Sequence, residues 1–150
     1  TYVAGDGQSR FLHAILQRRL TGQRCPACKK VLFVGGGMSN AVCPMCVELL
    51  DELVDLVPTG TVTTFCIVNV PFHGQTIEIP YVQANILLDG ADGTLMHVIQ
   101  ECSASEVRMG MRVEAVWRPD DELVPSLDSI RHFRPTGEPN ASFETYQAFA

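Results

Sequence analysis

The chain has 150 residues, of which 46% are hydrophobic, with a formal net charge of −6 and an isoelectric point near 5.1. This length suits one domain with a small appendage. No apolar run reaches the roughly 20 residues of a membrane helix, and the negative charge disfavours a general nucleic-acid binder. The N-terminus shows no signal-peptide pattern, and the absence of an initiator Met suggests a trimmed chain or a domain of a longer protein.

An amphipathic helix is predicted over residues 9–20, within an N-terminal helical segment of residues 1–22. Ser9 is placed to cap this helix and Gly22 is expected to end it. Because the segment that follows has little core of its own, we expect the apolar face of the helix to be exposed and available to a partner protein. The residues of that face are Phe11, Leu12, Ile15 and Leu16.

Four of the six cysteines form two Cys-x-x-Cys pairs in a predicted zinc ribbon of residues 23–50. Cys25 and Cys28 are separated by fourteen residues from Cys43 and Cys46. Each pair can form a tight knuckle, and four thiolates complete the tetrahedral shell of a structural Zn²⁺ with no open position for water. An iron–sulfur site uses the same ligands. A redox dithiol is the weaker alternative, because two adjacent motifs make a better cage than two separate active sites.

The other two cysteines, Cys66 and Cys102, lie in apolar segments, so we expect them to be buried thiols. A metal site together with free thiols is typical of a reducing compartment, which predicts a cytoplasmic protein.

Residues 51–135 are predicted to form a five-stranded barrel. Residues 48–57 fit either a helix or a short strand, and the two Asp-Gly pairs at residues 89–93 predict a hairpin turn. We expect the tail, residues 136–150, to be loosely ordered, although Phe143, Tyr146 and Phe149 are spaced for a short docking helix. The strands are expected at residues 61–70, 81–88, 94–99, 111–118 and 129–133.

The remaining chemistry-bearing residues do not form a catalytic pattern. The histidines, His13, His73, His97 and His132, lack metal-ligand spacing and are expected to be ordinary surface or core residues. No nucleophile–base motif or nucleotide-binding motif is present, so we predict no catalytic residue. A basic cluster near the cysteines is either a solvated face or a contact for an anionic ligand; it comprises Arg18, Arg19, Arg24, Lys29 and Lys30.

Over residues 10–135 the ordered set of motifs resembles the acyl-CoA-associated zinc-ribbon/OB-fold family, long catalogued as a domain of unknown function. The resemblance implies a mainly β chain with an N-terminal helix, a rubredoxin-like zinc ribbon and a five-stranded OB-fold barrel, and it implies that residues 52–57 are extended. The segments that carry it are residues 20–28, 43–46, 60–65, 80–82 and 110–115.

The same resemblance implies an accessory role beside a thiolase-fold or lipid-transfer-protein-like enzyme, in a heterotetramer with two of each chain. The favoured partner is a retro-aldolase that cleaves a β-hydroxyacyl-CoA in steroid side-chain degradation, and the alternative is a thiolase or hydroxymethylglutaryl-CoA synthase. The acyl-CoA would be held mainly by the partner, and the basic cluster could contact the coenzyme phosphates or the interface.

Two other functions are weaker candidates. A nucleic-acid-binding ribbon or OB module needs a basic groove with exposed aromatic side chains, but only 7% of the residues are aromatic. A free-standing acyl-CoA hydrolase needs a base and a nucleophile that the sequence does not offer.

Overall fold

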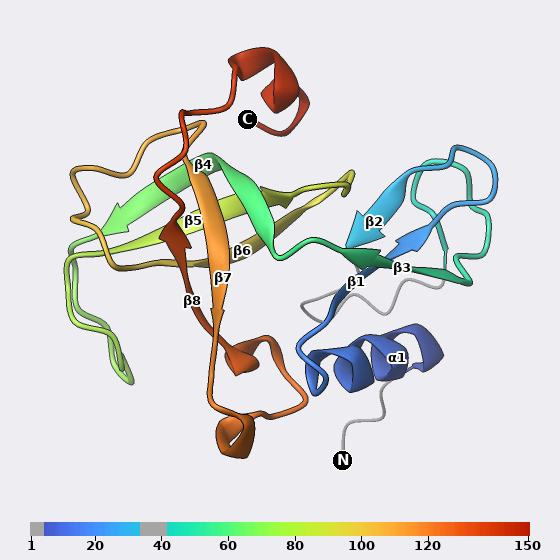
Figure 1. Cartoon of the computed structure of the whole chain (residues 1–150), viewed down its shortest axis with the longest axis horizontal. Helices are drawn as coiled ribbons and strands as arrows, with labels where there is room; N and C mark the ends of the chain where they lie inside the picture. Colours follow the sequence, from blue (N-terminus) through green and yellow to red (C-terminus); the bar gives the residue numbers. More distant parts are fainter. Residues whose placement is uncertain (1–4, 34–41) are drawn as a thin grey trace.

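The computed structural model describes residues 5–33 and 42–150, and it consists of a helix, a small ribbon and a barrel (Figure 1). No helix of these described residues has the length and apolar character needed to cross a bilayer. The elements are α1 (Asp6–Ile15), β1 (Leu20–Arg24), β2 (Val31–Phe33), β3 (Glu52–Leu56), β4 (Thr59–Val68), β5 (Tyr81–Leu88), β6 (Thr94–Ile99), β7 (Arg112–Trp117) and β8 (Ile130–Pro135), with 3₁₀ turns η1 (Asp120–Glu122), η2 (Leu127–Ser129), η3 (Phe143–Thr145) and η4 (Gln147–Phe149).

Helix α1 begins and ends earlier than the predicted helix. Its N-cap is Gly5 and not Ser9. The helix ends because Arg18 takes a left-handed conformation (φ 56°) and the Arg19 N–H donates to the Ala14 carbonyl at 2.9 Å. Gly22 therefore lies inside β1, where a Cβ atom would come within 2.7 Å of Val31 Cγ1, so the glycine permits close approach of β2.

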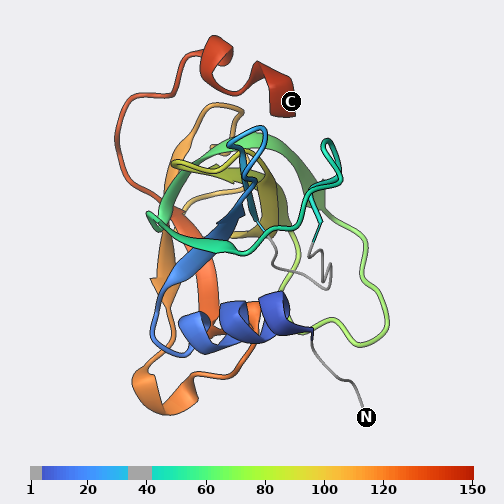
Figure 2. The same cartoon turned by 90° about the vertical axis from the view of Figure 1, so that its right-hand side faces the viewer.

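The apolar face of α1 is buried by the chain itself, which corrects the predicted partner surface. Phe11 and Ile15 are 2% and 0% exposed. They belong to the core that also holds β1 and β2 residues, and the Phe11 ring packs edge-on against Phe33 with centroids 5.3 Å apart. Leu12 is half-buried against this core, and only Leu16 is exposed. Figure 2 shows α1 running along one side of the ribbon.

The ribbon sheet has the strand order β2-β1-β3, with both pairs antiparallel. The extended conformation implied for residues 52–57 is confirmed by β3. This strand pairs with β1 from Leu20↔Leu56 to Arg24↔Glu52. The segment 51–135, expected to be barrel throughout, thus contributes its first strand to the ribbon.

The five remaining strands close into a barrel in the order β4-β5-β6-β8-β7, which confirms the mainly β, five-stranded prediction. β5 and β6 have the predicted bounds and form the predicted antiparallel hairpin. β6 and β8 run parallel and meet at one pair, Ile99↔Phe133. The barrel interior is filled by fully buried side chains that include Val62, Ile86 and Val113.

Asp92, in the β5–β6 turn, joins the barrel to the ribbon. Its N–H donates to the Val31 carbonyl at 2.7 Å, and its carboxylate accepts from the Val31 N–H at 2.9 Å. On the other side, Arg18 reaches the Asp120 carboxylate at 2.8 Å and the Arg118 carbonyl at 3.0 Å. The ribbon is therefore fixed to the barrel by polar contacts as well as by the shared core.

The C-terminal tail was expected to be loosely ordered, but it docks on the barrel. The Ala141 N–H donates to the Gly110 carbonyl at 2.8 Å, and Tyr146 is buried with its ring edge-on to Phe143. Of the three aromatic residues predicted to dock, Tyr146 is buried, and it lies between the short turns η3 and η4.

Candidate functional site

The two Cys-x-x-Cys segments fold into knuckles with the same backbone hydrogen bonds. In the first, the Cys25 N–H donates to the Lys30 carbonyl and the Lys29 N–H to the Cys25 carbonyl, at 2.9 and 3.0 Å. In the second, the Cys43 N–H and the Val47 N–H make the equivalent bonds, both at 2.8 Å. The residue after each second cysteine takes a left-handed conformation, with φ 63° at Lys29 and φ 59° at Val47.

These knuckles bring the four predicted cysteines together. Their sulfur atoms all lie within 4.8 Å of one another, and the Sγ atoms of Cys28 and Cys43 are 3.9 Å apart. A regular tetrahedron with metal–sulfur bonds of about 2.3 Å has an edge of about 3.8 Å. The cluster is therefore consistent with a zinc ribbon and could hold a metal ion, with Cys25 and Cys43 buried and the other two half-buried.

The electrostatics of the cluster favour a cation. The backbone N–H of Cys28 lowers the pKa of the Cys25 thiol to about 7. The hydrogen bond to the Cys28 side chain, with the charges of the neighbouring cysteines, raises the pKa of Cys46 to about 12. Four sulfurs this close repel one another as thiolates, and a bound divalent cation would relieve that repulsion.

The predicted basic cluster is largely neutralised within the chain. Arg18 pairs with Asp120, Arg19 with Asp55 at 2.6 Å, and Arg24 with Glu52 at 3.4 Å. Among the described residues, no ion pair is formed by Lys29 or Lys30. A role in binding phosphates remains a prediction, and it is best suited to these two lysines.

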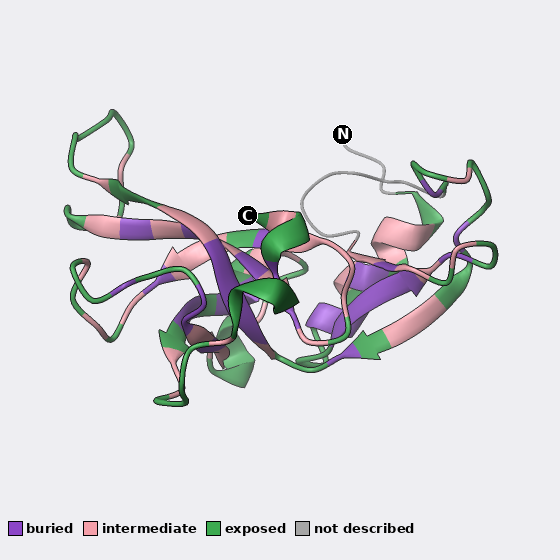
Figure 3. Cartoon of the chain, turned by 90° about the horizontal axis from the view of Figure 1, so that it is seen from above, coloured by how far each residue is buried: buried purple, intermediate pink, exposed green. Residues whose placement is uncertain are grey.

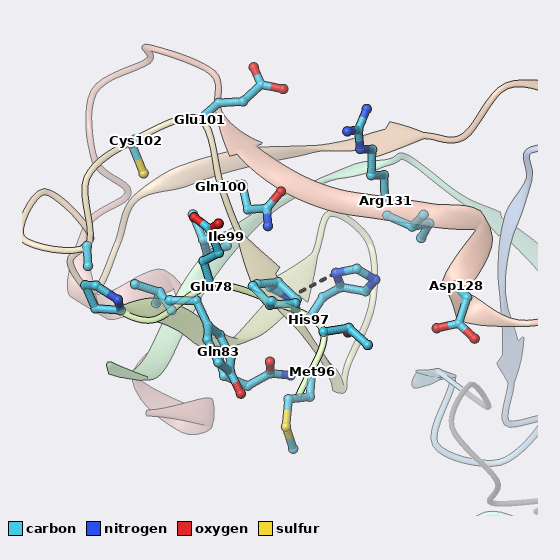
Figure 4. A pocket seen from close by; sticks show the side chains of 18 of the residues that line it. Glu78, Gln83, Met96, His97, Ile99, Gln100, Glu101, Cys102, Asp128 and Arg131 are labelled. Atoms are coloured by element: carbon cyan, nitrogen blue, oxygen red, sulfur yellow. Dashed lines mark hydrogen bonds between the residues drawn. The ribbon is translucent and has the colours of Figure 1, made fainter. Parts of the chain in front are cut away.

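A groove with a volume near 820 Å³ lies on the outer side of β5 and β6 (Figure 4). In OB-folds the second and third barrel strands form the face that binds oligonucleotides and oligosaccharides. Three carboxylates line this groove, from Glu78, Glu101 and Asp128, together with Arg131 and Arg118. Acidic side chains on this face oppose the binding of a phosphate backbone.

The histidines in the strands are engaged within the barrel wall. The His132 Nε2 atom lies 2.7 Å from the Glu101 carboxylate, and this hydrogen bond lowers the pKa of Glu101. Burial lowers the pKa of His97, whose Nδ1 accepts the Val98 N–H at 2.9 Å. His132 is buried, His97 is half-buried and lines the groove, and His13 and His73 are exposed.

The remaining cysteines differ from expectation. Cys66 is exposed on β4 and Cys102 is half-buried, so the prediction of two buried thiols is wrong for Cys66. Cys66 pairs with Gln83, which lines the groove outside β5 and β6, so the two side chains share the outer face of the sheet. In the described part of the chain, the four ribbon cysteines are the one group able to hold a metal ion.

Comparison with known proteins agrees with this geometry. Residues 53–118 match the family model described as the C-terminal OB-fold domain of ChsH2. A probable enoyl-CoA hydratase alpha subunit from Thermomonospora curvata is 32% identical over 126 residues, covering 83% of this chain; the chain spans only 36% of that relative's length. A DUF35 domain-containing scaffold protein from Methanocaldococcus jannaschii is 34% identical over 100 residues, covering 66% of this chain and 67% of the relative.

Two solved structures share the fold. A chain of the Ltp2-ChsH2(DUF35) aldolase superposes with a TM-score of 0.64 and 26% identity, covering 90% of this chain and 98% of that chain. A DUF35 protein of unknown function from Sulfolobus solfataricus superposes with a TM-score of 0.62 at 15% identity, covering 88% and 85%. The helix–ribbon–barrel arrangement is thus shared along nearly the whole chain.

Proposed function

Since the chain belongs to the DUF35 family of acyl-CoA-associated OB-fold proteins, we propose that it is a non-catalytic accessory subunit or domain that binds and stabilises a thiolase-fold enzyme. One observation carries this proposal: the chain matches almost the entire DUF35 chain of an aldolase complex named for Ltp2 and ChsH2. The scaffold protein from Methanocaldococcus jannaschii is a second relative whose name describes an accessory role.

The ribbon cysteines, in this proposal, hold a structural Zn²⁺. Four protein thiolates leave a zinc ion no open position, so the ion would stabilise the ribbon and activate no water. The spacing of the sulfur atoms supports this assignment.

The partner that we favour is a retro-aldolase that cleaves a β-hydroxyacyl-CoA in steroid side-chain degradation; a thiolase or hydroxymethylglutaryl-CoA synthase is the alternative. Carbon–carbon cleavage beside a thioester needs a base at the hydroxyl group and donors for the enolate oxygen. Within the described residues, the His97 Nδ1 atom accepts the Val98 N–H and the His132 Nε2 atom pairs with Glu101, so neither of these nitrogens is free to act as that base. We therefore assign catalysis and most of the acyl-CoA contacts to the partner. The proposed assembly is a cytoplasmic heterotetramer.

A nucleic-acid-binding function is disfavoured by the groove on the OB face. Its three carboxylates repel phosphates, and stacking of bases would need exposed aromatic rings that the groove offers only at Tyr81.

The proposal is tested by tagging the full chain in its native host and identifying the proteins that co-purify. We expect a thiolase-fold enzyme in a stable complex, whose carbon–carbon lyase activity requires this chain. Recovery of the chain without any thiolase-fold protein, or thioester turnover by the chain alone, would overturn the proposal.

A further inference from the structure

Four exposed apolar side chains lie on the second knuckle. Met45, Val47 and Leu49 are 67%, 78% and 67% exposed, and Val42 is also exposed. An antiparallel bridge between Val42 and Leu49 brings the two ends of this segment together. We call these four residues the apolar knuckle surface. In Figure 1 the segment lies at the end of the ribbon that points away from the barrel, and in Figure 3 the loops at this end are coloured mainly as exposed.

Metal binding does not require this surface. The first knuckle has the same backbone hydrogen bonds, yet Ala27 stands where the second has Met45, and Lys29 where it has Val47. A small and a cationic side chain therefore suffice for a knuckle of this geometry, and the apolar residues of the second knuckle need another explanation.

Val47 is the most informative of the four. A β-branched residue with φ 59° is a conformational outlier, because its branched Cβ crowds the backbone in the left-handed region. Lys29 holds the equivalent position with an unbranched side chain. Since Val47 is mostly exposed, burial in this chain does not offset the strain. The knuckle itself requires the left-handed backbone at this position, as Lys29 shows, but it does not require a β-branched side chain, so the choice of an exposed valine here points to a role outside this chain.

We infer that the apolar knuckle surface docks on the thiolase-fold partner, an inference that rests on the function proposed above. The exposed carboxylates of Glu48 and Asp51 flank the surface, so the complementary site is an apolar pocket with a basic rim. The same carboxylates oppose an anionic membrane or a nucleic acid. A knuckle clamped by metal also loses little conformational entropy on binding.

The flanking carboxylates disfavour a second copy of this chain, because docking this surface on itself would bring like charges together. Stable interfaces bury about 800 Å² on each partner, and their energy is concentrated in a few central anchors. Four side chains can supply such anchors but not the whole interface. The surrounding ribbon would have to contact the partner as well.

The test uses the purified complex of the full chain with the thiolase-fold enzyme that co-purifies with it. Val47→Lys gives the second knuckle the side chain that the first already carries, so metal content and melting temperature should be preserved. We expect the affinity for the enzyme to fall about 30-fold or more, as for an interface anchor. Val70→Lys is the matched control, because it makes the same change at a valine that is 74% exposed outside the ribbon, and it should change the affinity less than threefold.

Val47→Asn is a second variant, because Asn tolerates the left-handed conformation. It should raise the melting temperature of the isolated chain while weakening the complex, whereas a purely structural role would lower both. In the wild-type complex, amide exchange should slow at residues 42–49 more than at residues 25–30.

Wild-type affinity in both Val47 variants would overturn this inference and leave the proposed function standing. A wild-type chain that dimerises through Val47 would overturn it in favour of a second copy. If the wild-type chain bound no thiolase-fold protein, the proposed function itself would fail.

Discussion

The ribbon and the barrel are held together by different means. The barrel encloses a large apolar core, in which Val62, Ile86 and Phe133 are fully buried. Around the knuckles the only buried cluster consists, among the described residues, of Cys25, Cys43 and Leu50. A cluster this small cannot stabilise an independent fold, so we expect the knuckles to depend on a bound metal ion where the barrel depends on packing.

The sheet and the knuckles of the ribbon also differ in how they are stabilised. Its sheet contributes Leu20, Val31 and Leu56 to the same core as the barrel strands. The knuckles lie beyond that core. The metal should therefore control the order of the knuckles first, and the barrel only through the sheet they share.

Loss of the metal site is the largest effect that we predict. Cys43→Ser removes one of four thiolates from a site whose apparent binding energy in zinc-finger peptides is about 10–16 kcal/mol. The variant should lose its metal, and amide protection should collapse at residues 25–30 and 43–48 while β5 and β6 stay protected. Elemental analysis and hydrogen exchange on the purified chain measure both outcomes.

Cys66→Ser is the matched control, because Cys66 is exposed and far along the chain from the ribbon. It should retain one zinc per chain and the wild-type exchange pattern. Iron in the wild-type protein, or full knuckle protection without metal, would contradict the predicted dependence of the ribbon on zinc.

The sequence predicts those parts of the barrel and the ribbon that have local signals. β5 and β6 were predicted with the observed bounds, since apolar alternation and Asp-Gly turns are local signals. The clustering of the four ribbon cysteines was also predicted, because cysteine spacing encodes the knuckles directly. β1 was missed, because the helix before it ends at a left-handed arginine, Arg18, and not at a glycine.

The docking surface that we infer could not be predicted from the sequence. Phe11 and Ile15 have the pattern of an unpaired amphipathic face, but the ribbon sheet and the barrel cover them through contacts distant in sequence. Val47 carries no such pattern. Its importance depends on its backbone conformation and exposure, and both become visible only in three dimensions.

A smaller effect is expected at the junction between ribbon and barrel. Asp92→Ala removes the carboxylate that accepts the Val31 N–H, leaving that half-buried donor without its partner. We expect the free energy of unfolding to fall by about 2 kcal/mol, with faster exchange in β2 than in β5. Urea unfolding of the metal-loaded chain measures the loss. The exposed Asp121→Ala should be neutral, and equal destabilisation by the two variants would rule out a specific role for Asp92.

The smallest predicted effect belongs to the barrel and appears in acid. Arg112 donates to both carboxylate oxygens of Asp89 at 2.8 and 2.6 Å, and Thr59 also donates to this group. The hydrogen bonds from Arg112 lower the pKa of Asp89. A carboxyl group with a lowered pKa in the folded state stabilises the fold fully above its ordinary pKa of about 3.9, and this stabilisation disappears as the pH falls through the lowered value.

Asp89→Asn should therefore cost about 1 kcal/mol at pH 7, a value reduced by the partial exposure of the pair. The difference from wild type should shrink as the pH falls below 4.

The ribbon should lose its metal at higher pH than this, because protons compete with the metal for the cysteine sulfurs. Barrel unfolding in urea can be followed by far-ultraviolet circular dichroism, and metal release with a chelating dye. Measuring both across the pH range separates the two transitions. If the difference between Asp89→Asn and wild type were unchanged between pH 7 and pH 3, the stabilisation would not depend on the ionised Asp89. If metal release and barrel unfolding coincided at every pH, the ribbon and the barrel would form a single cooperative unit.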